Sequence, residues 1–270
     1  VPDGWQYRPN GSSPRIHVRQ ENLSSARVRL VMRTKLSVNL NKVALLRNSR
    51  DTTIPSVVDA ARTSIAAGAD GLTVHPRPDM RHIRPSDVYD LAELLARDEY
   101  KHIEFNIEGN PYAEREGDFP GFMSLIEGTR PHQCTLVPDT PEQLTSDHGW
   151  DLTAESNRLR PIIDQCHRAN VRVSLFMDPN EDQITRAADL EADRIEFYTG
   201  PYAEAWGTSV EKTQSHLAAF KSASQHAEAA GLAINAGHDL NQENLAQFCR
   251  TLGNVAEVSI GHAIIADALW

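Results

Sequence analysis

Short apolar runs alternate with longer amphipathic segments along this chain, and this alternation constrains its fold more than any other feature. Eight runs are rich in β-branched residues, at 36–40, 71–75, 103–107, 133–137, 172–176, 194–198, 232–235 and 257–260. The segment after the first run is typical of the longer ones, because Val57, Ala61 and Ile65 recur at helical spacing and Gly68 then follows as a helix C-cap would. Strands that alternate with helices form parallel βαβ units, and eight of them predict a single-domain (β/α)8 barrel.

An open doubly wound sheet is the main alternative to the barrel. Such a sheet that binds a dinucleotide carries a GxGxxG turn after an early strand, and this chain has none. We therefore expect no dinucleotide cofactor. After the eighth run, "GHAIIADALW" leaves room for only a short helix. The last helix thus looks truncated, or another segment or subunit covers that flank of the barrel.

The overall composition limits which kinds of partner the chain can bind. The 270 residues carry a formal net charge of −10, which argues against nucleic acid or an anionic membrane as a partner. There is no apolar run of about 18 residues, so no membrane span is expected. The three cysteines, Cys134, Cys166 and Cys249, are far apart and form no CxxC pair. This usage predicts a reducing, cytoplasmic setting without disulfides or a structural zinc site.

Residues 1–31 differ from the rest of the chain in composition. They are rich in Arg, Ser, Pro and Gly and lack the apolar stretch of a secretory signal. A transit peptide is conceivable, but Asp3 and Glu21 count against it. We expect a flexible leader outside the fold, followed by a barrel domain at 32–270.

Polar and ionisable residues gather where the predicted strands end. The chemistry of these barrels lies at the C-terminal ends of the strands. The residues found there are Asn39, Asn41, Lys42, His75, Arg77, Asn106, Glu108, Asp139, Asp178, Glu196, Tyr198, Thr199, Asn235, His238, Gly261 and His262. One such residue alone is usually structural, but a full ring of them predicts an acid–base site.

Two kinds of loop suggest an anionic substrate. The stretch "GLTVHPRPDMRHIRPSD" (71–87) places Arg77, Arg81 and His82 on a proline-stiffened loop of an acidic protein. Such a local cationic cluster favours a small anion over a polymer. "NAGHD" and "SIGHA", after the seventh and eighth strands, each set a glycine beside a histidine ahead of a helix. The loops after these two strands commonly bind phosphate in barrels, although either could be a plain turn.

Three reaction types are disfavoured by absent residues. A metal-dependent hydrolase would carry an HxH pair after the first strand, where this chain has Asn39-Leu40-Asn41. A Schiff-base aldolase needs a lysine inside the barrel, and of five lysines only Lys42 is near a strand end. A triosephosphate-isomerase arrangement would place Lys, His and Glu on other strands. Metal-free acid–base chemistry on a phosphorylated carbonyl compound remains.

A series of motifs now points to a family. "VNLNKVALLRNSR", "GLTVHPRPDMRHI", "NIEGNP", "LVPD", "VSLFMDP", "IEFYTG", "INAGHDL" and "IGHAII" occur in this order. Together they closely resemble the pyridoxine 5′-phosphate synthase family, from about Lys35 to the last residue. The resemblance implies a (β/α)8 barrel that assembles as a homo-octamer. It also implies a transferase-type synthase of vitamin B6 biosynthesis, which condenses 1-deoxy-D-xylulose 5-phosphate with 3-amino-2-oxopropyl phosphate. The products would be pyridoxine 5′-phosphate, phosphate and water, with no metal or organic cofactor.

The resemblance also assigns roles to residues. It implies that His75 and Glu108 are acid–base groups, that His238 is a further proton donor and that Glu196 steadies a transition state. We expect Glu108 to stay ionised beside His and Arg, and a neighbouring His to titrate near neutrality. The positions that match the deoxyxylulose phosphate site are Asn41, Lys42, Arg77, His82 and Thr145. Those that match the amino-ketone phosphate site are Asn39, Arg50, Gly261 and His262, and Asp239 is a further substrate-binding position in the phosphate loop.

The chain departs from the family at three points. Asn41-Lys42 stands where many members have Asp-His, Tyr198 where His is common, and Asp239 where Gly is common. An acidic Asp239 is unfavourable beside a phosphate, so we expect it to turn away and N-cap the next helix. These departures indicate a divergent branch of the family. Two other readings stay open: a different metal-free isomerase or lyase on the same scaffold, and a barrel that only binds a phosphometabolite.

Overall fold

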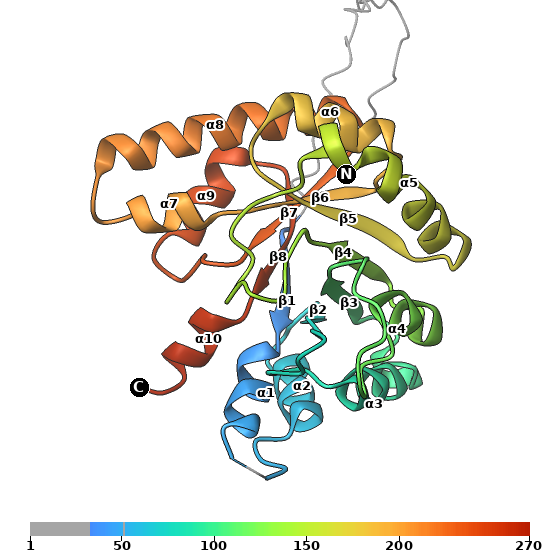
Figure 1. Cartoon of the computed structure of the whole chain (residues 1–270). Helices are drawn as coiled ribbons and strands as arrows, with labels where there is room; N and C mark the ends of the chain where they lie inside the picture. Colours follow the sequence, from blue (N-terminus) through green and yellow to red (C-terminus); the bar gives the residue numbers. More distant parts are fainter. Residues whose placement is uncertain (1–32, 51) are drawn as a thin grey trace, which may run out of the picture. The chain divides into compact units, whose positions relative to one another are not determined.

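Eight parallel strands close into a barrel in the computed structural model, which describes residues 33–50 and 52–270 (Figure 1). The strands are β1 (Lys35–Asn39), β2 (Gly71–Val74), β3 (Glu104–Gly109), β4 (Gln133–Leu136), β5 (Arg172–Met177), β6 (Arg194–Phe197), β7 (Ala233–Gly237) and β8 (Val255–Ile260). Each pairs with its neighbours in sequence, and β8 pairs with β1. The predicted (β/α)8 fold is therefore confirmed, while the predicted leader at 1–31 lies outside the described residues.

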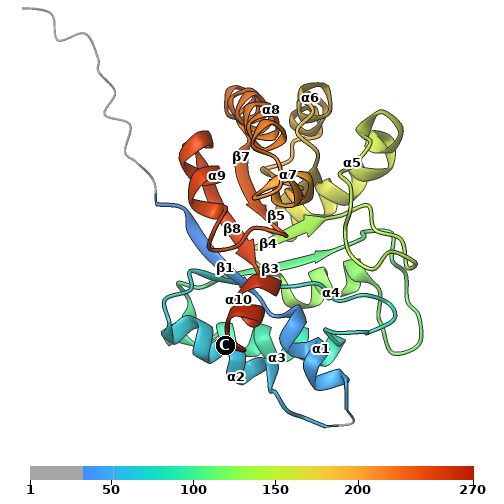
Figure 2. The same cartoon turned by 90° about the vertical axis from the view of Figure 1, so that its left-hand side faces the viewer.

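Helices surround the strands (Figures 1 and 2). They are α1 (Asn41–Asn48), α2 (Val57–Ala66), α3 (Pro85–Leu95), the 3-10 turn η1 (Asp98–Tyr100), α4 (Phe122–Thr129), α5 (Leu152–Arg168), α6 (Glu181–Asp189), α7 (Gly200–Ala205), α8 (Val210–Ala229), α9 (Leu245–Leu252) and α10 (His262–Asp267). Gly68 follows α2 with φ +102°, as its predicted C-cap role requires. The last helix is short, with six residues, and packs on α1. Among the described helices, none has the length and apolar character of a membrane span.

Two strands continue two residues further than the sequence pattern predicts, and both end in a glycine. β3 reaches Gly109, where an added Cβ would lie 2.5 Å from the ring of Phe122. β7 reaches Gly237, where a Cβ would lie 2.1 Å from the carbonyl oxygen of Ser259. Glycine in a strand usually signals a break, but here it allows the close approach of a neighbouring element. The predicted ends were wrong for this reason.

The inside of the barrel carries polar groups along its length. Glu104, Asn106 and Glu108 alternate along β3 and are all buried. Since alternate residues of a strand share a face, the three side chains point the same way, into the barrel. At the N-terminal end of the strands lies a group of charged residues that we call the lower network: Lys35, Glu104, Arg172, Arg194 and Glu257. The candidate site occupies the opposite end.

Candidate active site

His75 follows β2 directly and is positioned by two asparagines from the first strand end. The Asn41 side-chain oxygen accepts the backbone N–H of His75 at 2.9 Å. The Asn39 side-chain oxygen in turn accepts the backbone N–H of Asn41 at 3.0 Å. Asn41, predicted as a substrate contact, thus uses its side-chain oxygen to hold the β2 loop. The amide nitrogen of Asn39 donates to Glu108 Oε2 at 3.4 Å, so β1 is linked to both acid–base residues.

The imidazole of His75 lies between two carboxyl groups. Its Nδ1 is 3.9 Å from Glu108 Oε2, and its Nε2 is 3.8 Å from Asp139 Oδ2. Burial, reinforced by the charges of Arg77 and His238, lowers the pKa of His75 to about 3. Burial, with repulsion from Glu196 and Asp139, raises the pKa of Glu108 well above its usual value. The expectation of an ionised Glu108 beside a histidine that titrates near neutrality is therefore wrong. Desolvation outweighs the attraction of opposite charges at this depth.

Glu196, on β6, is also buried, and its charge acts on Glu108. It pairs in register with Phe176 and Asn235, in the middle of the sheet. Burial raises the pKa of Glu196 to about 7, even though His238 and a hydrogen bond from Thr135 lower it. Its Oε2 has no hydrogen-bond partner in the described part of the chain. The site therefore contains two carboxyl groups that burial favours in the neutral, proton-carrying form.

His238 approaches from the opposite side of the barrel, on the loop after β7. Its φ of 45° is unusual for a residue with a side chain. Thr145 Oγ1 lies 2.7 Å from its Nε2, and Asp239 Oδ2 lies 2.7 Å from its Nδ1. The rings of Phe176 and Tyr198 pack against the imidazole at centroid distances of 6.3 and 5.8 Å. Both ring nitrogens and the ring orientation are thus specified by neighbouring residues.

Asp239 does not cap a helix, contrary to expectation. The next helix, α9, begins at Leu245 with Asn244 as its N-cap, so neither Asp239 nor the Gly237–His238 pair stands at a helix start. Burial alone would raise the pKa of Asp239. The hydrogen bond from His238 and the charges of His238, His262 and Lys42 outweigh burial and lower it. The acidic side chain is therefore engaged by its neighbouring histidine.

The arginines of the β2 loop are occupied by protein groups. Arg77 Nη2 donates to the carbonyl oxygens of Thr140 (2.8 Å) and Gln143 (3.0 Å), and its Nη1 donates to Asp139 at 3.3 Å. Arg81 donates to further carbonyl oxygens of the same β4 loop. In this structure the two arginines join the β2 loop to the β4 loop, and a phosphate would have to share or displace these contacts.

His82 does not add positive charge to the β2 loop. Its Nδ1 accepts the backbone N–H of Ile83, and burial followed by the charges of His75 and Arg77 lowers the pKa of His82 to about 3. The cationic character inferred for this loop thus comes from its arginines alone.

The remaining predicted phosphate residues lie near the ends of α1 and at the start of α10. Gly261 is the buried N-cap of α10, and a Cβ there would meet Asn39 at 2.9 Å. This close approach to β1 requires glycine whether or not a ligand binds. His262 and Arg50 are exposed and Lys42 is half-buried. Cations thus remain accessible on this part of the rim.

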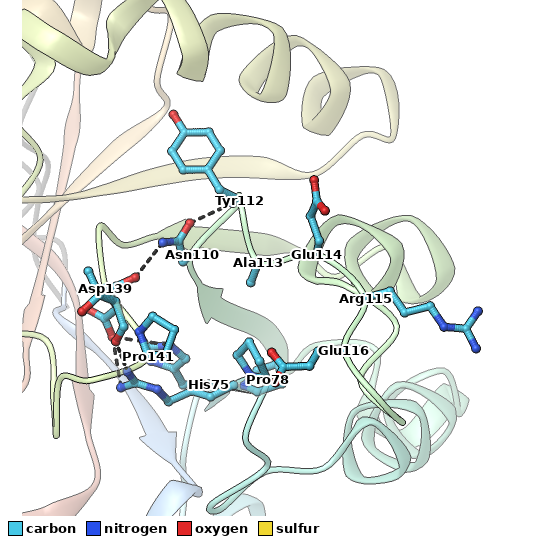
Figure 3. Close-up of a pocket in the computed structure, with 13 residues that line it drawn as sticks. His75, Pro78, Asn110, Tyr112, Ala113, Glu114, Arg115, Glu116, Asp139 and Pro141 are labelled. Carbon is cyan, nitrogen blue, oxygen red and sulfur yellow. Dashed lines mark hydrogen bonds and ion pairs between the residues drawn. The ribbon is translucent and has the colours of Figure 1, made fainter.

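Sequence reasoning missed two contributors to the site, Ser146 and Phe176, and it gave a third, Asp139, only as one of the strand-end residues, without a role. Asp139 lines a cavity of about 340 Å³ that also touches His75, Arg77 and Asn110. Figure 3 shows Asp139 and Asn110 on the same side as His75, with Arg115 extending away from them. Asp139 follows the end of β4 at Leu136 by three residues, and this place near a strand end was the signal for it. Nothing in the sequence indicates that Ser146, 7 residues further on, donates back to it.

The barrel and the buried ionisable groups at the C-terminal ends of its strands are typical of (β/α)8-barrel enzymes. Residues 36–270 match the family model described as "Pyridoxal phosphate biosynthesis protein PdxJ". The chain belongs to this family, which confirms the resemblance noted from the sequence. It is 55% identical over 239 residues, 88% of this chain and 92% of the relative, to the "Pyridoxine 5'-phosphate synthase" of Xanthomonas axonopodis pv. citri. The protein of the same name from Albidiferax ferrireducens is 53% identical over the same shares of each chain.

Distant solved structures agree on the fold. The structure of the Amycolatopsis orientalis BexX/CysO complex matches with a TM-score of 0.54 at 14% identity, over 87% of this chain and 82% of that one. The YdjI aldolase of Escherichia coli K12 matches with a TM-score of 0.53 at 9% identity, over 87% of this chain and 78% of that one. At such identities the likeness concerns the barrel alone.

Proposed function

We propose that this chain is a pyridoxine 5′-phosphate synthase. It joins 1-deoxy-D-xylulose 5-phosphate to 3-amino-2-oxopropyl phosphate, and it releases phosphate and water. The observation that carries the proposal is the His75 imidazole placed between Glu108 and Asp139, inside a barrel that matches the family over residues 36–270. Relatives at 55% identity that carry the name of this activity support it.

The protonation states suit the first steps of such a condensation. An amine that condenses with a ketone must lose protons, and the departing oxygen must gain one. A neutral His75 can accept a proton, and a protonated Glu108 or Glu196 can donate one. Each positioned acid or base contributes about 10²–10⁴-fold to rate. His238 would act as a further donor, as the family resemblance implies, and Asp239 Oδ2 holds its ring at 2.7 Å from Nδ1.

The phosphate groups would bind at the rim of the site. We assign the amino-ketone phosphate to Asn39, Arg50, Gly261 and His262. The sugar phosphate is assigned to Lys42, Arg77, His82 and Thr145. The exposed positions of Arg50 and His262 support the first assignment. The second requires the arginine contacts to the β4 loop to rearrange, because Arg77 is occupied by that loop. Assembly as a homo-octamer and a cytoplasmic location follow from the family resemblance and belong to the same proposal.

The test is to mix both substrates with purified protein and measure pyridoxine 5′-phosphate by its absorbance, together with released phosphate. Each substrate alone is the control. Both signals should appear in equal amounts only when both substrates are present. Phosphate release from a single substrate, with no ring product, would instead identify a lyase on the same scaffold.

A further inference from the structure

We propose that Asp139 is the positioning residue of His75: its carboxylate holds the imidazole proton on Nε2, so that the Nδ1 lone pair faces Glu108. The proposal deepens the proposed function and rests on it for its kinetic test. Its test by the position of the proton does not depend on which reaction the protein catalyses.

The Asp139 carboxylate is fixed from several directions. Its side chain is 4% exposed. Oδ2 accepts from Ser146 Oγ at 3.0 Å and from Arg77 Nη1 at 3.3 Å, and it lies 3.8 Å from His75 Nε2. The Asn110 side-chain amide donates to the backbone carbonyl oxygen of Asp139 at 2.6 Å, which fixes the backbone as well (Figure 3). A shift of less than 1 Å would bring the imidazole into hydrogen-bond range.

The two carboxyl groups around the ring have different charge environments. Glu108 receives a weak hydrogen bond from Asn39 and faces the carboxyl groups of Glu196 and Asp139, so it favours the protonated form. Asp139 faces the guanidinium of Arg77 and a serine hydroxyl. Burial raises the pKa of Asp139, and these two donors oppose that rise without cancelling it. Since both donors point at Oδ2, the atom nearest His75 Nε2, this oxygen is the acceptor beside the ring.

A neutral imidazole between an acceptor and a donor has one favoured tautomer. Its N–H points to the carboxylate, and its lone pair points to the acid. The other charged or titratable groups that act on His75 are Arg77, Arg81, His238 and Asp79, with His82 in edge contact at 6.2 Å. Of these groups, only Asp79 favours a charged ring, and it is exposed. Asp139 is therefore the buried anion within 4 Å of Nε2 that can stabilise the imidazolium.

This arrangement gives the pair a defined proton path. The O–H bond of Glu108 breaks as the N–H bond at His75 Nδ1 forms. Glu108 is left as a carboxylate that can accept a substrate proton, and the positive imidazolium is stabilised by Asp139. No oxidant, reductant or further reactant is needed. Without Asp139 the imidazolium would have no carboxylate at its Nε2 side to offset Arg77 and Arg81, and the proton would stay on Glu108.

The kinetic experiment compares Asp139→Asn with Asp139→Glu and with Glu142→Gln, an exposed carboxylate on the same loop. Asp139→Asn should lower kcat about 100-fold, with KM for both substrates within about threefold, because proton transfer slows while binding does not. Asp139→Glu should recover most of kcat, and Glu142→Gln should match the wild type. If Asp139→Asn instead raises KM for the sugar phosphate and leaves kcat unchanged, Asp139 acts only through Arg77 and the proposal is overturned.

A nitrogen-15 NMR experiment on histidine-labelled protein provides the independent test. The His75 signals are assigned by their loss in His75→Gln. The wild type should show the proton on Nε2, and Asp139→Asn should shift the population toward Nδ1, since an amide can donate to Nε2. A wild-type proton on Nδ1 overturns the proposal even if Asp139→Asn fails to fold. If the wild type makes no pyridoxine 5′-phosphate but keeps the Nε2 proton, the proposed function fails and the positioning role stands.

Discussion

Glu104 and Glu108 lie on the same strand, point into the same barrel and are buried to the same extent, at 7% and 8% exposure. They differ in their partners. Glu104 accepts hydrogen bonds from Arg172 and Arg194, and Lys35 Nζ lies 3.7 Å away. Among the described residues, Glu108 accepts a hydrogen bond only from the amide of Asn39, and the imidazole of His75 lies 3.9 Å away. The same residue type is thus an ion-paired anion at one end of the barrel and a neutral acid at the other.

This difference in partners predicts that Glu104 contributes to stability and Glu108 to catalysis. A buried carboxylate with well-placed guanidinium partners is costly to break, because removing it leaves those charges unpaired. A buried carboxyl group without such partners carries its proton and can give it up when a ligand changes its surroundings. We therefore expect substitutions in the lower network to change the free energy of unfolding, and substitutions around His75 to change turnover.

The largest expected effect is that of Glu108→Gln on turnover. Glutamine keeps the shape of the neutral acid but carries no transferable proton. Turnover should fall by about two to four orders of magnitude, the usual worth of one acid–base group. The free energy of unfolding at pH 7 should be unchanged or slightly higher, because no charge partner is lost. The measurements are single-turnover product formation and urea denaturation.

The matched control is Glu104→Gln, the same substitution four residues earlier in β3. If Glu108→Gln keeps wild-type turnover, Glu108 takes no part in proton transfer. If it unfolds the protein, the two ends of the barrel do not differ as argued.

Glu104→Gln should produce the opposite pattern. The substitution leaves Arg194, whose side chain is 14% exposed, without most of its counter-charge. The free energy of unfolding should fall by about 3 kcal/mol, as for other broken buried ion pairs. Turnover per folded molecule should stay within about threefold of the wild type. A large loss of turnover at full folding would show that the lower network is coupled to the site.

Glu257→Gln tests the member of the lower network whose pKa is raised, as the pKa values of the active-site carboxyl groups are. Burial and the neighbouring Glu104 raise the pKa of Glu257 to about 7, although Arg194 opposes this. The unfolded chain loses this proton near pH 4.5, whereas the folded chain keeps it to about pH 7. The free energy of unfolding therefore decreases as the pH rises through this window. Relative to wild type, Glu257→Gln should gain on the order of 2 kcal/mol between pH 5 and pH 8.

Urea denaturation at both pH values measures the effect of Glu257→Gln, with Glu243→Gln, an exposed carboxylate before α9, as the control. Equal pH dependence in wild type and Glu257→Gln would show that Glu257 is ionised in the fold.

The sequence predicted the barrel and the ring of polar strand ends because both depend on local periodicity. It could not predict the protonation of Glu108 or His75, because their pKa values depend on burial and on charges from strands far along the chain. It also could not predict that the β4 loop binds the guanidinium of Arg77. The carbonyl oxygens that bind this arginine lie 63 and 66 residues away and carry no side-chain signal. Loop-to-loop contacts of this kind decide which predicted ligand-binding residues remain accessible.

Thr145→Val should have the smallest effect and concerns one of these loop contacts. The hydroxyl lies 2.7 Å from His238 Nε2 and ties the exposed part of the β4 loop to the β7 loop. Valine has the same shape but no hydroxyl, so His238 loses one of the two contacts that fix its ring nitrogens and keeps Asp239. Loss of one neutral hydrogen bond is worth about 1 kcal/mol, which corresponds to a roughly fivefold fall in turnover. The free energy of unfolding should change by less than about 0.5 kcal/mol, because Thr145 is exposed. Thr145→Ser, which restores the hydroxyl, should recover the wild-type rate in the same assay. If serine and valine reduce turnover equally, the methyl group rather than the hydrogen bond matters, and His238 is held by Asp239 and the rings of Phe176 and Tyr198 alone.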